Sequence, residues 1–283
     1  MSHLLHPEYF SKIPFKGAAL RQTFEALSEE ASQEVSEYGE LTVAIRTLNE
    51  AGRLALLLTD IKEQEYNGEI EIIVVDNESS DDTVAVAKKF GAKVLSFPRE
   101  EFTYPRSMNL AMEAASTCNV FLTVGHAQLV SKQSLQAGYN RMRLDSVGGV
   151  YGHALPSGNA STIENIIAIG NVSFVNRRTH STTGLGVMAA TGAIFDREQW
   201  ESLGGFNELY EQGGEDGELT QKIIDNGYSV VDEPLLSTHH THGLNLINTV
   251  RQWSAWSKLG APSRLDRHAL MKRRPDLKLD DLK

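Results

Sequence analysis

The chain has 283 residues, with 37 acidic residues against 27 Lys and Arg, a formal net charge of −10 and 41% hydrophobic residues. This balance is typical of a folded globular protein, and the acidic excess argues against a nucleic-acid binder. The single cysteine, Cys118, excludes a disulfide framework or a thiolate zinc cluster within the chain. No apolar run approaches the roughly 18 residues of a membrane span, and no signal-peptide pattern opens the chain. We therefore expect a cytoplasmic protein.

Residues 1–40 differ in composition from the rest of the chain. A helix is predicted over Ala18–Ser36, which is rich in Glu and Gln and has only a thin set of apolar residues. We interpret this segment as an appended helix or a partner surface, separate from the catalytic core.

From Leu41 onward, short β-branched segments alternate with helical patterns. Leu54, Leu57, Leu58 and Ile61, for example, fall on one face of a helix. The predicted strands of this half are Leu41–Thr47, Glu69–Val75, Ala92–Phe97 and Asn119–Val124. Such alternation indicates βαβ units and an α/β fold with a mostly parallel sheet. Because these sheets bind ligands beyond the carboxyl ends of their strands, we expect the chemistry in the loops that follow them.

The second half has weaker signals. Strands are predicted over Val147–Tyr151 and Met188–Phe195, and a helix over about Glu215–Asn226. We expect a catalytic domain over residues 41–243 and a helical tail over 244–283. Trp253 and Trp256 in this tail indicate either a surface that rests on a membrane or side chains that pack on the core.

Two segments carry a family resemblance. Residues 42–50 read TVAIRTLNE, and residues 72–83 read IIVVDNESSDDT. Together they resemble the opening of the family 2 glycosyltransferases, over roughly residues 41–243. The resemblance implies a GT-A fold, with a mostly parallel central sheet flanked by helices, and transfer of a sugar from a nucleotide-diphosphate sugar during glycan or polysaccharide biosynthesis. Neither a P-loop, a dinucleotide fingerprint nor a nucleophile elbow is present.

The resemblance also implies a nucleotide-binding set. Asp76 ends a predicted strand, where its carboxylate can accept hydrogen bonds from a base or a ribose hydroxyl; the alternative is a turn and helix cap. Arg106 stands near a helix start and can pair with a diphosphate, or it is simply solvated there. The implied nucleotide-binding residues are Thr47, Asn49, Glu50, Asp76, Arg106 and Asn109.

The metal motif of the family is altered. Most members carry an Asp-x-Asp after the fourth strand that holds Mn²⁺ or Mg²⁺, but residues 121–128 here read FLTVGHAQ. His126 takes that place, similar to a branch of the family with a histidine there. It can ligate a metal, for which imidazole suits Mn²⁺ better than Mg²⁺; the diphosphate can instead be neutralised without metal; or the protein is inactive. A His-His-Thr-His run at residues 239–242 matches the family's C-terminal metal ligand, so we expect His126 and His242, with His242 preferred to His240.

Residues 213–218, GGEDGE, resemble the Glu-Asp motif of the family. A general base needs a carboxylate at a helix start that faces the sugar, and the flanking glycines allow a close approach. The resemblance implies that Asp216 is the catalytic base of an inverting transfer and that Glu215 orients a sugar. The alternative is helix capping by acidic residues.

Two other functions stay open. The missing Asp-x-Asp motivates a catalytically silent GT-A module that binds nucleotide or glycan for a partner. A nucleotidyltransferase ranks last, because the turn at residues 46–50 has no glycine-rich phosphate loop. For the transferase, the acceptor is a glycan, a lipid-linked saccharide or a small molecule; a lipid-linked acceptor would bring the protein to the inner face of the membrane.

Overall fold

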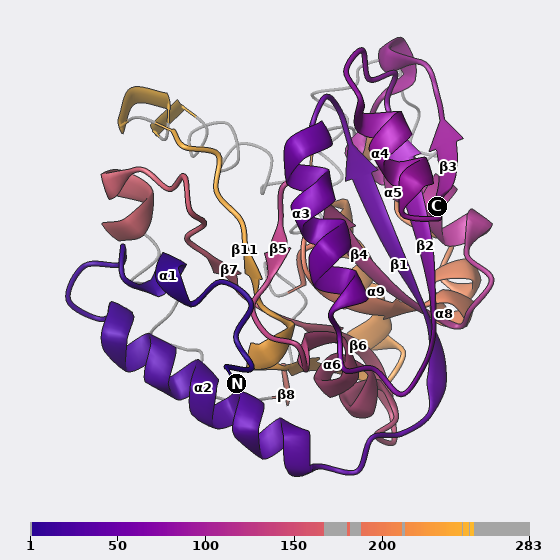
Figure 1. The fold of residues 1–283 in the computed structure, drawn as a ribbon. Coiled ribbons are helices and arrows are strands. Elements are labelled where there is room, and N and C mark those ends of the chain that lie inside the picture. Colours follow the sequence, from indigo (N-terminus) through magenta and orange to yellow (C-terminus); the bar gives the residue numbers. More distant parts are fainter. Residues whose placement is uncertain are drawn as a thin grey trace.

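The computed structural model describes residues 2–166, 180–181, 188–210, 213–244, 246–248 and 250–251. Its centre is an eight-stranded sheet in the order β3-β2-β1-β4-β9-β6-β10-β8 (Figure 1). Neighbours from β3 to β4 run parallel, as do β6 and β10, whereas β9 is antiparallel to both β4 and β6. The strands are β1 (Gly39–Thr47), β2 (Gly68–Asp76), β3 (Lys93–Ser96), β4 (Asn119–Val124), β6 (Val147–Tyr151), β8 (His180–Ser181), β9 (Ala193–Asp196) and β10 (Ser229–Asp232). The predicted mostly parallel α/β sheet is confirmed.

Helices cover both faces of this sheet, as Figure 1 shows. One face packs on α3 (Ala51–Lys62), α4 (Thr83–Lys89) and α6 (Ser134–Met142), and the other on α5 (Tyr104–Ala114), α8 (Arg197–Ser202) and α9 (Glu215–Asp225). Side chains of β1 alternate between the two layers, with Val43 and Ile45 in the first and Ala44 in the second. Strands covered on both sides need apolar residues on both sides, which explains the continuous apolar runs in the sequence.

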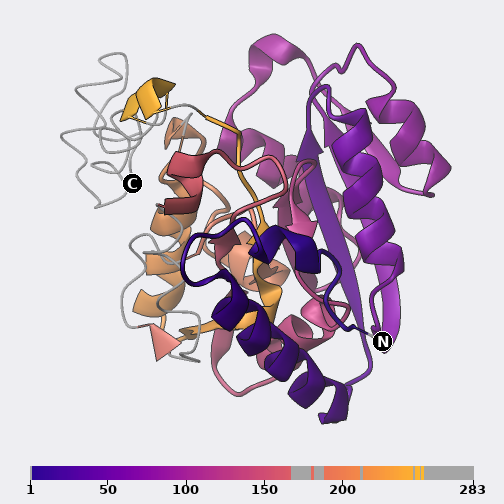
Figure 2. The ribbon, with the colours of Figure 1, turned by 60° about the vertical axis from the view of Figure 1, so that its left-hand side comes forward.

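A second, small sheet joins three distant loops. Its strands are β5 (Gln128–Leu129), β11 (Thr238–His239) and β7 (Ala154–Leu155), in the order β5-β11-β7. Helices α1 (Pro7–Phe10) and α2 (Gly17–Gln33) lie along this part of the domain (Figure 2). Phe10 and Phe24, both fully buried, form a third core cluster with Leu155 and Leu235. The N-terminal segment therefore shares a hydrophobic core with the rest of the domain.

The structure moves some predicted boundaries. The predicted helix over Ala18–Ser36 is α2, which ends at Gln33 because Glu34 is extended. The predicted strand Met188–Phe195 is β9 over Ala193–Asp196 only, since residues 189–192 form a turn in which the Gly192 N–H donates to the Ala189 carbonyl. Trp253 and Trp256 lie outside the described residues. None of the helices in the described ranges is both long and apolar enough to cross a membrane.

Candidate active site

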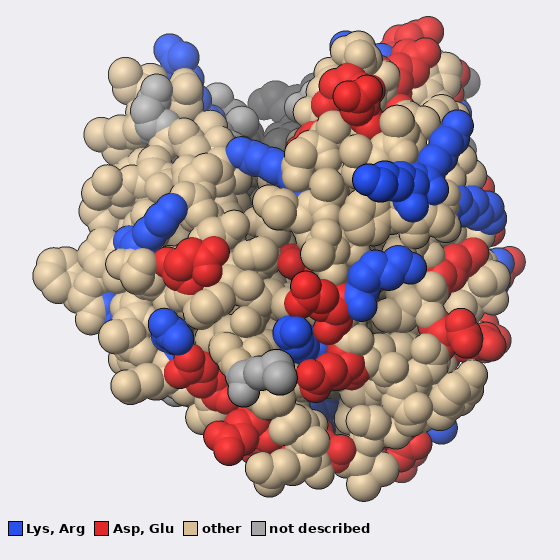
Figure 3. Space-filling model, viewed as in Figure 1, with Lys and Arg blue, Asp and Glu red and all other residues tan. Residues whose placement is uncertain are grey.

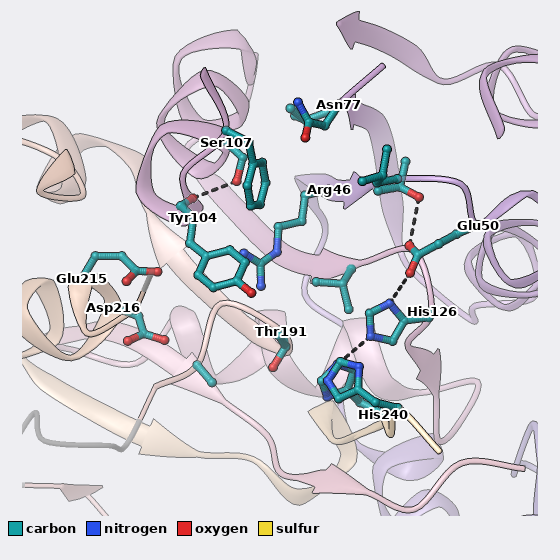
Figure 4. Close-up of a pocket in the computed structure, with 18 of the residues that line it drawn as sticks. Arg46, Glu50, Asn77, Tyr104, Ser107, His126, Thr191, Glu215, Asp216 and His240 are labelled. Atoms are coloured by element: carbon teal, nitrogen blue, oxygen red, sulfur yellow. Dashed lines mark hydrogen bonds and ion pairs between the residues drawn. The ribbon is translucent and has the colours of Figure 1, made fainter. Parts of the chain in front are cut away.

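A cavity of about 650 Å³ opens at the carboxyl ends of β1, β2 and β4. This is the edge of the sheet at which the sequence predicted chemistry, and the volume is that of a small-molecule site. Its walls come from β1, from the start of α5, from the turn before β9 and from the start of α9 (Figure 4). On the face of the molecule seen in Figure 3, acidic and basic side chains are interspersed, so the net charge of −10 forms no patch there.

Three histidines meet on one side of the cavity. His126 follows β4, whereas His240 and His242 follow β11, and one ring nitrogen of each lies within 4.8 Å of the others. The Nε2 atoms of His126 and His240 are 2.9 Å apart. The pairing of β5 with β11 holds the two chain segments at this separation. The cluster thus contains both predicted ligands, His126 and His242. It also contains His240, which the sequence analysis ranks below His242.

Strand alternation separates His239 from its neighbour His240. His239 points to the N-terminal segment, where its Nδ1 donates to the Pro156 carbonyl at 2.7 Å and its ring packs edge-on against Phe10. Burial lowers the pKa of His239 to about 3. Burial, and then His126 and His242, hold the pKa of His240 well below its usual value. A neutral imidazole is the form that ligates metal, and the lowered pKa of His240 favours that form.

A carboxylate orients the first histidine. The Nδ1 of His126 is 2.5 Å from Oε1 of Glu50, and Thr47 donates its hydroxyl to Oε2 of the same carboxylate at 3.0 Å. Gly125 makes this approach feasible, because a Cβ atom there would lie 2.5 Å from both the Glu50 carboxylate and the Thr47 hydroxyl. Thr47 and Glu50, predicted for nucleotide binding, therefore line the cavity and also support His126.

Two adjacent carboxylates occupy the opposite side (Figure 4). Glu215 and Asp216 form the first turn of α9, after Gly214 with a left-handed φ of 106°. Glu215 is only 3% exposed; burial, and then Asp216, raise its pKa to about 8. Burial likewise raises the pKa of Asp216, whose Oδ1 accepts the Gly217 N–H at 2.7 Å. The two pKa values are thus raised to different extents by their surroundings, and that of Glu215, about 8, keeps its carboxyl group protonated at neutral pH.

Arg46 enters the cavity between these two groups, and the sequence interpretation missed it. Its guanidinium carbon lies 4.3 Å from the centroid of the Tyr104 ring. Burial lowers its pKa from the ordinary value, against an opposing effect of Tyr104 and Glu215. A signal was present, because an arginine that interrupts an apolar strand buried on both faces is unusual.

The other strand-end residues lie deeper or further out. Asp76 is 1% exposed; its Oδ2 accepts the Ser79 N–H at 3.0 Å, and its buried Oδ1 has no partner among the described residues. The next residue, Asn77, lines the cavity. Asn49, with a left-handed φ of 54°, supports the turn after β1 by accepting the Ser80 N–H at 2.7 Å, and it does not line the cavity.

The structure places Arg106 and Asn109 away from the cavity. Arg106 pairs on the surface with Glu101 at 2.5 Å. Asn109 accepts the Phe206 N–H at 2.9 Å and so braces the turn that follows α8. Their positions follow from helix geometry: Tyr104 and Ser107, three residues apart on α5, face the cavity, so residues 106 and 109 face other ways.

A family model and several curated relatives match the chain. The model described as "Glycosyl transferase family 2" matches residues 42–198, which is more than half of the chain. The O-antigen chain rhamnosyltransferase WbaN of Salmonella anatum is 25% identical over 190 residues, or 64% of this chain and 59% of the relative. An uncharacterized glycosyltransferase of Rickettsia felis is 47% identical over 58 residues, 20% of this chain and 19% of the relative. The chain thus spans less than two thirds of the length of these relatives.

Solved structures share the fold. The mannosyltransferase PcManGT from Pyrobaculum calidifontis, in complex with GDP-Man and Mn²⁺, superposes with a TM-score of 0.58 at 19% identity over 97% of this chain and 77% of that chain. S. aureus TarS 1–349 in complex with UDP-GlcNAc gives 0.59 at 16% identity, over 81% of this chain and 67% of that chain. At such identities the likeness concerns the fold alone.

Proposed function

The chain belongs to glycosyl transferase family 2, and on that basis we propose that it is an inverting glycosyltransferase that uses a nucleotide-diphosphate sugar. The observation that carries the proposal is the arrangement within one cavity. A buried carboxylate pair faces a histidine cluster at the carboxyl edge of the sheet, with Arg46 between them. A base and a set of groups for an anionic leaving group are what this transfer requires.

In the proposed reaction Asp216 accepts the proton of the acceptor hydroxyl. The hydroxyl oxygen then forms a bond to the anomeric carbon as the bond from that carbon to the diphosphate oxygen breaks. The nucleoside diphosphate leaves with the bonding electrons, and the configuration inverts in the single step. Glu215, whose raised pKa keeps it protonated near neutral pH, can donate a hydrogen bond to a sugar hydroxyl.

The histidine cluster fits a divalent metal ion. Two nitrogens that each lie about 2.1 Å from one ion are about 3 Å apart, and the Nε2 atoms of His126 and His240 are separated by 2.9 Å. A set of neutral imidazoles favours Mn²⁺ or a softer ion over Mg²⁺. When bound, the ion would supply positive charge to the diphosphate. His126, His240 and His242 would hold it, and Glu50 keeps the His126 ring in place.

We propose that the nucleoside of the sugar donor binds near Asp76 and Asn77. The unpartnered Oδ1 of Asp76 offers an acceptor for a base or ribose group, and Asn77 lines the cavity beside it. Donors bound by the structural neighbours, GDP-Man and UDP-GlcNAc, and the rhamnosyltransferase named among the relatives define the sugars to test. We propose a hexosyl or deoxyhexosyl donor and a glycan, lipid-linked or small-molecule acceptor.

The test is a panel of UDP-, GDP- and dTDP-sugars, each with saccharide and lipid-linked acceptors, in the presence of Mn²⁺ and after chelation. Mass spectrometry of the products is expected to show transfer from one donor class, and NMR of the product is expected to show inversion at the anomeric carbon. Tight calorimetric binding of a nucleotide without transfer or hydrolysis of any donor would instead identify a silent binding module.

A further inference from the structure

Arg46 lines the cavity as a partly exposed cation whose Nη1 atom is buried, and the reaction step described above gives it no role. We propose that Arg46 binds the terminal phosphate of the nucleoside diphosphate, the group that leaves in the reaction, in an inference that rests on the proposed function. This assigns a second binding site for the leaving group, separate from the histidine cluster.

The guanidinium group lacks partners that a buried arginine normally has. Its Nη1 is inaccessible to solvent and makes no hydrogen bond within the described ranges. None of the ion pairs found in that part of the chain involves Arg46, whereas the partly buried Arg141 contacts both Glu34 and Glu233. Arg46 instead stacks on the Tyr104 ring, with its guanidinium carbon 4.3 Å from the ring centroid. This contact orients the guanidinium plane and leaves its N–H donors available.

Such an arrangement is costly in the absence of a ligand. A charged group that is taken out of water without a full set of hydrogen bonds destabilises the folded state. A bound anion would supply the hydrogen-bond acceptors that the guanidinium group of Arg46 lacks. Among the described residues that line the cavity, Arg46 is the sole Arg or Lys.

The position of Arg46 indicates which anion it binds. In Figure 4 its side chain lies between the Glu215–Asp216 pair and the His126–His240 pair. In the proposed reaction the anomeric carbon would lie near the carboxylates and the diphosphate near the histidines, so the scissile bond would lie between them. The phosphate oxygen that receives the electrons from this bond is the one closest to Arg46, and a guanidinium matches a phosphate with two parallel N–H donors.

The experiment compares nucleoside diphosphates with monophosphates. Calorimetry measures binding of UDP and UMP, GDP and GMP, and dTDP and dTMP to the full chain and to Arg46→Met, with Mn²⁺ saturating throughout. Loss of a charge-assisted contact is expected to weaken diphosphate binding about ten- to a hundredfold and monophosphate binding less than about twofold. Arg46→Lys keeps the charge but has no planar pair of N–H donors, so its diphosphate affinity is expected to lie between those of the wild type and Arg46→Met.

Two controls separate this role from a structural one. Arg46→Met should bind Mn²⁺ as the wild type does, and its unfolding midpoint without ligand should not fall, because an uncompensated cation has been removed. Arg21→Met, a surface arginine paired with Glu25 on α2, should change neither nucleotide affinity.

If Arg46→Met loses affinity equally for diphosphates and monophosphates, or loses none for either, the assignment is overturned. No loss for either nucleotide is the result expected if Arg46 binds a carboxylate of an acidic sugar. Failure of the wild type to bind any nucleoside diphosphate would instead refute the proposed function itself.

Discussion

The carboxylate of Glu50 lies 2.5 Å from Nδ1 of His126. This contact makes Nδ1 the protonated nitrogen and directs the lone pair of Nε2 toward the other two histidines. The carboxylate is in turn fixed by the Thr47 hydroxyl, so the turn after β1 supports a histidine that lies 76 residues beyond Glu50 in the chain.

Glu50→Gln is expected to weaken Mn²⁺ binding about 10–100-fold, although Glu50 is not itself among the proposed ligands. The amide cannot stabilise the same tautomer as strongly. Calorimetric titration with Mn²⁺ measures the effect, and Glu63→Gln, which alters a surface pair with Lys132, provides the control. An affinity equal to that of the wild type would show that Glu50 does not act through His126.

After treatment with a chelator, transfer activity is expected to return with Mn²⁺ and to return far less with Mg²⁺, since Mg²⁺ prefers oxygen ligands. His240→Ala should require much more Mn²⁺ for the same rate, because it removes one of the clustered nitrogens. His3→Ala, distant from the cavity, is the control. Full activity of the chelated enzyme would mean that the cluster has a different function.

Asp216→Asn is expected to fold as the wild type does and to lose about 10²–10⁴-fold in kcat, the usual contribution of a general base. Asp225→Asn near the other end of the same helix should retain activity. Circular dichroism and donor affinity report on the fold, and single-turnover assays report on the chemical step. Turnover close to that of the wild type in Asp216→Asn would move the base to another residue.

Glu215 is expected to make the free energy of unfolding fall as the pH rises. Its usual pKa of 4.5 becomes about 8 in the folded protein, so between these values the folded state retains a proton that the unfolded chain has lost. This contribution is complete below pH 4.5 and is lost as the pH rises through about 8. Relative to Glu215→Gln, the wild type should lose up to about 1.4 kcal/mol per pH unit in that window.

Urea unfolding at several pH values tests this expectation, with the exposed Glu198→Gln as the control, which should track the wild type. A difference between wild type and Glu215→Gln that does not change with pH would mean that Glu215 is ionised in the folded state.

Phe10→Ala is expected to lower the free energy of unfolding by about 3–5 kcal/mol, because Phe10 is fully buried between Phe24 and His239. Phe15→Ala is a matched control from the same segment, since Phe15 is completely exposed. Equal midpoints for the two variants would show that the N-terminal segment unfolds separately from the domain.

The sheet could be predicted because its information is local. Residues 119–124 read NVFLTV, mostly apolar and β-branched, and the structure makes a strand with those limits; the weaker signal at residues 147–151 also gave the observed limits. The extent of β9 could not be predicted in this way, because Ala189 and Thr191 resemble strand residues yet form a turn fixed by distant partners: the Thr191 carbonyl accepts from Thr123 and Thr238.

His126 and Asp216 both line the cavity, as expected for a residue that follows a strand and a residue that starts a helix. The sequence could not decide between His240 and His242, because their placement depends on the pairing of β5 with β11. That pairing directs both side chains toward the cavity and the side chain of His239 away from it. Arg106 resembled a diphosphate ligand by its place near a helix start, but the rotation of α5 about its axis takes it to the surface.

The two chain segments that pair as β5 and β11 are far apart in the sequence, and His126 and His240 are separated by 114 positions. A polypeptide emerging from the ribosome can therefore pair β1 with β2 early, but it has no complete histidine cluster until nearly all of residues 41–243 are synthesised and folded. Assembly of the cluster would then mark the finished domain, and a chain truncated before β11 would have most of the sheet without the three clustered histidines.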